Sequence, residues 1–449
     1  MQQDWRGNAV TAESAATLAG IDAFVQGFLA YETTAAQIIP AAEADPDCAL
    51  ANAYAAMANL FLESPAGLAA ARPFLARAEA AAPQATPRER LTVAAARAWA
   101  DGDIPRAIAL GETAAAEFPR DLALAKVTQY HHFNRGDAAG LLRVAATVLP
   151  ANDDLAYAHG MIAFGYEQCH RLGDAEQAAH AAIRRRRKEP WAHHALAHVL
   201  LTQGRNDEGR EFLEEVKDTW TGLNSFMLTH NWWHLSLVMI EQGEAARVLD
   251  HYATHIWGVW KEYSQDQIGA VSLLARLELA GVDVGDRWQD LADHLAPRVA
   301  EHVQPFLDLH YLYGLARAGR PQAAAMLADL RAFAATAPEH ARTAWQDVAL
   351  PAAEGLCAHA AGDHTRAVRM LLPVLPRLAE IGGSHAQRDL FEQIADDALI
   401  QAGHLAAAQG RLEQRRAGNP GSAPTRARLA AVYRALGLPA QAARVAAGH

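Results

Sequence analysis

Two pairs of histidines are the residues of this sequence whose type and spacing most directly suggest chemistry. His194 and His198 lie in WAHHALAH, and His230 and His234 lie in HNWWH. Each pair has i,i+4 spacing, which on an α-helix places both imidazoles on one face with Cβ atoms roughly 5–6 Å apart. The pairs are 36 residues apart, which is close to the length of one helical-hairpin repeat. On neighbouring helices, the four imidazoles would therefore point into one groove.

Further polar residues recur at about the same period on the helices expected to line the concave side of a repeat array. Asp266 follows His230 by another 36 residues. The longer later repeats continue this column, and a second strip runs one helical turn further on. The column contains His194, His230, Asp266, Asp308, Asp347 and the segment Ser384–Asp389, the second strip contains His198, His234 and His310, and Glu167 and His255 lie further from its centre.

Buried polar groups are costly unless they are satisfied, and three kinds of partner could satisfy this column. Backbone carbonyls and aspartates of neighbouring repeats are the first. A divalent transition metal is the second, because histidine is the commonest nitrogen ligand for zinc, iron and copper. Its expected ligands are His194, His198, His230 and His234, and a carboxylate such as Asp266 or Glu167 would complete four or five ligands. A small polar ligand is the third, and the HxxxH spacing alone does not decide, because it lacks the general-base glutamate of HExxH.

The segment GGSHAQRD, residues 382–389, predicts a helix start that could bind an anion. Its two glycines end the preceding helix, and Ser384 with Gln387 three residues later has the pattern of a capping box. An arginine in the first turn opposes the helix dipole, so we expect Arg388 to pair with an acidic group or an anionic ligand. We expect His385 to be exposed.

The composition and the remaining motifs argue against several functional classes. The net charge is −11 with histidine neutral, which argues against a nucleic-acid partner because such binding depends on clustered Lys and Arg. The 3 cysteines are far apart and predict no disulfide framework, so a cytoplasmic location is expected. The N-terminus predicts no signal peptide, and no apolar run of about 18 residues predicts a membrane span. Nucleophile elbows and glycine-rich nucleotide loops are absent.

The elements that must position the polar column are predicted to be helical hairpins. Alanine dominates the apolar 51% of the chain and favours helix over strand. A glycine, often followed by an acidic residue, recurs at intervals of 31 to 43 residues. Such a glycine closes one helix, and the acidic residue favours the start of the next. The marks are Gly102, Gly136, Gly173, Gly204, Gly243, Gly281, Gly319, Gly362, Gly403 and Gly437.

We therefore predict an all-α fold, a single tetratricopeptide-like superhelix or α-solenoid over residues 1–449. Residues 12–90 are expected to form N-terminal helical pairs, and residues 91–410 degenerate repeats with the polar groove centred on residues 191–244. Residues 411–449 are expected to form a C-terminal cap. Individual helices are predicted over residues 12–31, 34–44, 48–63 and 67–82, with another opening at Asp286.

Several of these motifs resemble the tetratricopeptide repeat protein 38 family. They are WAHHALAHVL, THNWWHLSL, GVDVGDRWQDL, FLDLHYLYGLARAG, DVALP and GGSHAQRDLF. The match runs in order over about residues 12–410, is most specific in HNxWH and GGSxAQRD, and ends near residue 415. The resemblance implies a solenoid fold without a settled activity. It marks His194, His198, His230, Asn231, His234, His255, Asp266, Asp308, His310, Asp347, Ser384, Gln387, Arg388 and Asp389.

Two functions from different classes follow. The first is a cytoplasmic binding protein whose His/Asp-lined groove takes a small polar ligand, or a peptide or protein partner, by analogy with the fold. The second is a metal-dependent enzyme in which the four paired histidines are ligands or acid–base groups. The groove carries His and Asp instead of the Lys, Arg and Asn columns typical of peptide clamps, which favours a small polar ligand or a metal.

Overall fold

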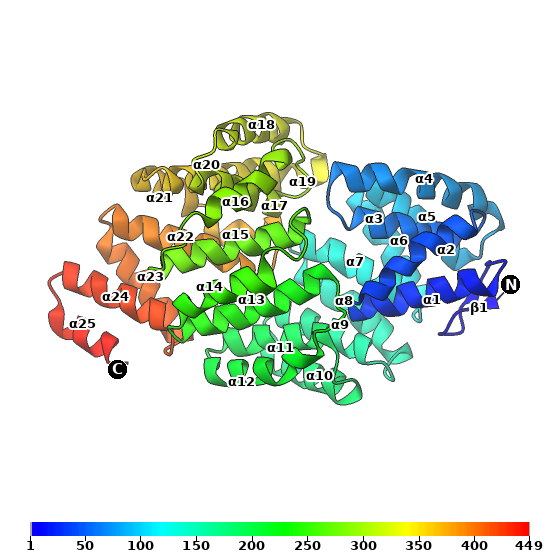
Figure 1. The fold of residues 1–449 in the computed structure, drawn as a ribbon, viewed down its shortest axis with the longest axis horizontal. Coiled ribbons are helices and arrows are strands. Elements are labelled where there is room, and N and C mark those ends of the chain that lie inside the picture. Colours follow the sequence, from blue (N-terminus) through cyan, green and yellow to red (C-terminus); the bar gives the residue numbers. More distant parts are fainter. Residues whose placement is uncertain (1, 449) are drawn as a thin grey trace. The chain divides into compact units, whose positions relative to one another are not determined.

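The computed structural model describes residues 2–448, and nearly all of its regular elements are helices (Figure 1). A hairpin of two short antiparallel strands, β1 (Gln2–Gln3) and β2 (Ala9–Val10), precedes the helices. The helices follow one another as α1 to α25, which confirms the predicted all-α fold of helical pairs. The chain divides into two compact units: the first comprises residues 1–196 and 219–227, and the second comprises residues 197–218 and the chain from Leu228 onward.

Paired helices fill the first unit, and their alanine-rich faces pack against larger side chains. Ile21, Phe24 and Tyr54 are fully or almost fully buried in its core together with small residues such as Ala51 and Ala55. Small side chains let helix axes approach closely, while the aromatic rings fill the remaining volume. The helices are α1 (Ala15–Ala30), α2 (Ile38–Ala44), α3 (Ala49–Leu60), α4 (Pro65–Ala81), α5 (Pro87–Ala100), α6 (Ile104–Glu117), α7 (Leu122–Asn134), α8 (Ala138–Val148), α9 (Ala156–Gln168) and α10 (Leu172–Arg185).

The predicted glycine marks end helices as expected, with one exception. Gly102 has φ 75°, and the Asp103 carboxylate after it accepts a hydrogen bond from the backbone of the next helix. Gly173 was predicted to be such a mark, and this is wrong. His170 takes the left-handed conformation instead, with φ 55°, so the turn comes three residues earlier and Gly173 lies inside α10.

Two helices, α11 (Pro190–Thr202) and α13 (Ser225–Glu241), each continue through the division between the units. The other helices of the second unit are α12 (Asn206–Val216), α14 (Val248–His251), α15 (Ser264–Leu279), α16 (Arg287–Leu295), α17 (Pro305–Arg317), α18 (Gln322–Thr336), α19 (Glu339–Thr343), α20 (Leu350–Ala360), α21 (His364–Leu371), α22 (His385–Gln401), α23 (Leu405–Gly418), α24 (Ala423–Ala435) and α25 (Pro439–Ala446). Short 3₁₀ turns occupy Thr33–Gln37, Ala82–Gln84, Leu149–Ala151, Lys217–Thr219, Ala245–Arg247, Ala296–Arg298 and Leu375–Ile381, and π turns occupy Tyr252–Ile256 and Ala344–Ala349.

Two predicted helix starts in the second unit are confirmed. Asp286 is the N-cap of α16. Ser384 and Gln387 form a capping box at α22, in which each side chain bonds the other residue's backbone. Within residues 2–448, no helix is both long enough and apolar enough to cross a membrane.

Candidate functional site

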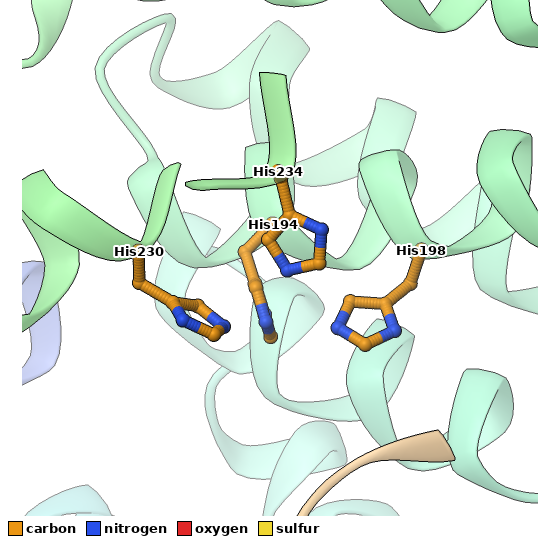
Figure 2. Close-up of side chains that lie close together, drawn as sticks. All are labelled: His194, His198, His230 and His234. Atoms are coloured by element: carbon orange, nitrogen blue, oxygen red, sulfur yellow. The ribbon is translucent and has the colours of Figure 1, made fainter. Parts of the chain in front are cut away.

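The two histidine pairs lie on α11 and α13, one helical turn apart within each pair. The rings of His198 on α11 and His234 on α13 have centroids 4.5 Å apart, and those of His230 and His234 are 4.8 Å apart. His194 precedes His198 by one turn of the same helix. Each of the four offers one ring nitrogen, and these nitrogens all lie within 4.8 Å of one another. Figure 2 shows the four rings gathered around one region.

All four imidazoles are buried. Their residues are between 0% and 8% exposed, with His230 the most exposed. The ring of His194 stacks on Trp191, and that of His230 stacks on Trp233. Burial, together with a smaller contribution from the neighbouring His198, lowers the pKa of His230 to about 3. His230 is therefore neutral at pH 7, the form in which imidazole binds a metal.

The ligand group contains imidazoles without a carboxylate. Asp266 was one of the two carboxylates expected to complete a metal site, and it does not belong to this group. The other, Glu167, forms a separate group with His198 and His385, whose ligand atoms lie within 4.8 Å of one another. Asp266 is buried and accepts hydrogen bonds from the Thr229 hydroxyl at 3.1 Å and the Trp260 backbone at 3.2 Å. Its carboxylate therefore ties α15 to α13 and to the loop that precedes α15.

Asp308 and Asp347 of the predicted column, and His310 of the second strip, each have a partner close in the sequence or on a neighbouring element. The Asp308 carboxylate lies 2.5 Å from Nδ1 of His302, and burial raises the pKa of Asp308 to about 6. His310 shares a hydrogen bond of 2.8 Å with the Phe306 carbonyl one turn earlier on α17, and burial lowers its pKa to about 4. Asp347 is exposed. None of these three belongs to the four-histidine group found in residues 2–448.

His302 is a residue of this region that the spacing argument missed. Its Nε2 lies 2.9 Å from the Asp329 carboxylate, so its ring bridges Asp308 and Asp329. The ring also stacks on Phe333 with centroids 4.7 Å apart. His302 stands in the turn before α17, outside the helical periodicity, and only its proximity to Asp308 in the sequence could have indicated it.

The helix start at α22 binds groups of the protein itself. Arg388 donates to the carbonyl oxygens of Gly382 and Gly383 in the turn before the helix. The Asp389 carboxylate accepts two hydrogen bonds from Arg415, at 2.6 and 3.1 Å. Burial alone would raise the pKa of Asp389, but the Arg415 guanidinium holds it well below its usual range. An anionic partner for Arg388 stays a prediction.

His385 was expected to be exposed, and this is wrong. It is half-buried, and its Nε2 shares a hydrogen bond of 2.9 Å with the Thr202 hydroxyl at the end of α11. Its ring lies 5.2 Å from that of His198. The first residue of α22 therefore packs beside the histidines of α11, and no local feature of GGSHAQRD indicates a neighbour so distant in the sequence.

The three residues between His230 and His234 differ in burial: Asn231 and Trp233 are buried, and Trp232 is half-buried. Trp233 is buried, and the Arg276 guanidinium lies over its ring at 5.3 Å. Trp232 faces away and stacks on His255 with centroids 3.7 Å apart. Asn231 is fully buried, and neither polar atom of its side chain has a hydrogen-bond partner within residues 2–448.

Comparisons with known proteins add only distant likenesses. No protein-family model matches the chain. A human IFIT1 dimer with PPP-AAAA is similar with a TM-score of 0.39 and 11% identity, over 97% of this chain and 90% of that one. The TPR domain of P58(IPK) is similar with a TM-score of 0.23 and 13% identity, over 78% of this chain and 99% of that one. Likenesses of this size support no inference about function, which therefore depends on the site itself.

Proposed function

We propose that this chain is a metal-binding helical-repeat protein that holds a divalent transition metal with His194, His198, His230 and His234. The observation that carries the proposal is the convergence of four ring nitrogens within 4.8 Å of one another. Nitrogen ligands about 2 Å from one ion lie about 3–4 Å apart. Small side-chain rotations would therefore bring all four into coordination distance.

Packing alone explains such a cluster less well. Imidazole is polar, and burying four imidazoles in one place removes them from water, which leucine or alanine would not require, so packing by itself gives no reason for choosing histidine at all four positions. A bound cation offsets that cost by binding the lone pairs of neutral rings. The neutral state of His230, held by burial, fits this role.

The ligand set restricts the metal and its use. Imidazole nitrogen suits zinc, copper, nickel and cobalt, whereas magnesium and calcium prefer oxygen ligands. Four protein ligands complete a tetrahedral shell and leave no position for water or substrate, as in structural zinc sites. This favours a structural or storage role at this centre over the metal-dependent enzyme also considered from the sequence.

The experiment is elemental analysis of purified protein without an affinity tag, for the wild type and His234→Gln. We expect the metal content to fall by about one equivalent per chain in the variant, because one of four ligands is lost. His404→Gln, at an exposed histidine, is the control and should keep the full content.

Two outcomes would contradict the proposal. A folded wild type that neither contains nor takes up zinc, copper, nickel or cobalt would exclude it and leave a small polar ligand as the leading hypothesis. Unfolding of both His198→Gln and His234→Gln, with the wild type metal-free, would identify the histidines as packing residues. Far-ultraviolet circular dichroism separates loss of metal from loss of fold.

A further inference from the structure

A second group of metal-ligating side chains lies in the second unit, away from α11 and α13. It consists of His359, His364 and Asp397, each of which offers one ligand atom, and these atoms lie within 4.8 Å of one another. All three residues line a cavity of about 470 Å³. A cavity of this size can hold a small molecule.

A tight turn between two helices brings the histidines together. His359 is in the last turn of α20, and Gly362 follows with φ 79° in the left-handed region. The Asp363 carboxylate then caps α21 by accepting from the backbone of Arg366 at 3.0 Å. His364 is thereby the first residue of α21, and its ring centroid lies 5.5 Å from that of His359.

The carboxylate comes from α22, which packs against α21. Nε2 of His359 lies 3.0 Å from the Asp397 carboxylate, and Nδ1 lies 3.2 Å from the Tyr313 hydroxyl. An ionised carboxylate can only accept, so Nε2 carries the proton and Nδ1 accepts from Tyr313. Burial alone would raise the pKa of Asp397, but the His359 hydrogen bond and the Arg428 guanidinium lower it.

The contacts of His364 are incomplete in the structure. Its Nδ1 is buried and has no hydrogen-bond partner within residues 2–448. Buried polar atoms of proteins nearly always have a partner, and an unsatisfied one needs an explanation. This nitrogen is part of a histidine beside a second histidine and a carboxylate, so a cation is the partner that fits it.

We propose that His359, His364 and Asp397 bind one divalent transition metal. Two imidazoles and one carboxylate are a recurrent ligand set for zinc and for non-haem iron, and such sites keep positions open for water or substrate. The existing 3.0 Å separation between His359 and Asp397 already suits two ligands of one ion.

The Tyr313 hydroxyl can hydrogen-bond to His359 both in the metal-free protein and when His359 binds a metal. When Nε2 of His359 binds the metal, the ring proton moves to Nδ1, and the Tyr313 oxygen accepts from it. A hydroxyl can do this because it both donates and accepts. The charge of His359 is unchanged, and the ring keeps its orientation, as outer partners of metal-bound histidines usually ensure.

The cavity also indicates what could occupy the open positions. Arg317 and Arg428 line it together with the three ligands. Arg317 is paired with Glu278 at 3.0 Å, and Arg428 lies 3.5 Å from Asp397. Both guanidinium groups are thus paired with carboxylates that line the same cavity, so the divalent ion itself is the positive charge that would favour a small anion at the open positions.

The test is titration of the full-length protein with Co²⁺, which reports its ligands through visible absorption, combined with equilibrium dialysis to count bound ions. His364→Gln and Asp397→Asn should each reduce affinity at one site by at least about tenfold, because loss of even an outer partner costs about 10–100-fold. The number of tightly bound ions should fall by one per chain. His404→Gln is the matched control and should bind as the wild type does.

Binding unchanged in folded His364→Gln and Asp397→Asn would overturn the proposal, as would Co²⁺ binding that is equally weak in all variants. Should one variant fail to fold, the other decides alone, because the two residues lie on different helices. The result is independent of the four-histidine proposal: His234→Gln removes an ion from that centre and leaves the His364-dependent ion in place.

Discussion

The two histidine groups of this chain differ in what surrounds them and in how many ligands they offer. On α11 and α13, four imidazoles gather in a buried region; the group of four contains no carboxylate, although the Glu167 carboxylate lies within 4.8 Å of a ring nitrogen of His198. At the α20–α21 turn, two imidazoles and Asp397 line an open cavity with two arginines. Ligand number separates the roles of metal sites, since four protein ligands close the coordination shell and three leave it open. On the two proposals made above, the same residue type would serve a closed centre in one region and an open centre in the other.

The largest expected effect concerns stability. Zn²⁺ at 1,000 times its dissociation constant should stabilise the folded chain by about 4 kcal/mol, and we expect the four-ligand centre to contribute most because it binds more tightly. Thermal unfolding of the wild type, His198→Gln and His364→Gln, each with Zn²⁺ and with a chelator, measures this. Loss of most of the zinc-dependent shift in His364→Gln instead of His198→Gln would reverse the assignment of the tighter site.

An intermediate effect is expected at the hydroxyl that orients His359. Tyr313→Phe should weaken Co²⁺ binding at the open centre by about 10–100-fold, because the outer partner of a ligand is lost. The four-histidine centre should be unaffected. Tyr311→Phe, a buried tyrosine on the same helix, is the control for altered packing, and an equal loss of affinity in it would show that packing, not orientation of His359, is responsible.

The smallest expected effect, a change in the Co²⁺ spectrum, shows which of the two centres has an open coordination position. Azide added to the Co²⁺-loaded protein should change the visible spectrum, because an anion can occupy the open position at His359, His364 and Asp397. The change should persist in His198→Gln and disappear in His364→Gln. A response that depends on His198 would mean that the four-histidine centre is the open one.

The parts of the fold that depend on neighbours in the sequence were predictable. The capping box of Ser384 and Gln387 and the N-cap at Asp286 require only residues within one helical turn. The two i,i+4 histidine pairs were likewise visible, because helix geometry fixes their relation. The repeat period then indicated that neighbouring helices would carry them, and the structure brings their rings together.

Features that depend on distant segments were not predictable in the same way. His385 was expected to be exposed, but Thr202 and His198 of α11 cover it. His359 and His364 are five residues apart with a turn between them, so helical spacing does not relate them. Their carboxylate, Asp397, comes from another helix.

The turn before α17 has a consequence for proton binding. His302 has φ 45°, a conformation that is costly for residues other than glycine, and its ring is held between Asp308 and Asp329. Burial alone would lower the pKa of His302, but these carboxylates raise it. Protonated His302 therefore contributes to the stability of the folded chain. This contribution is fully present below the pKa of His302 in the unfolded chain and is lost as pH rises through its pKa in the folded chain. Protonation of His302 therefore stabilises the folded chain, in which this turn has its left-handed backbone conformation, in the same way that binding of any other ligand to the folded state would.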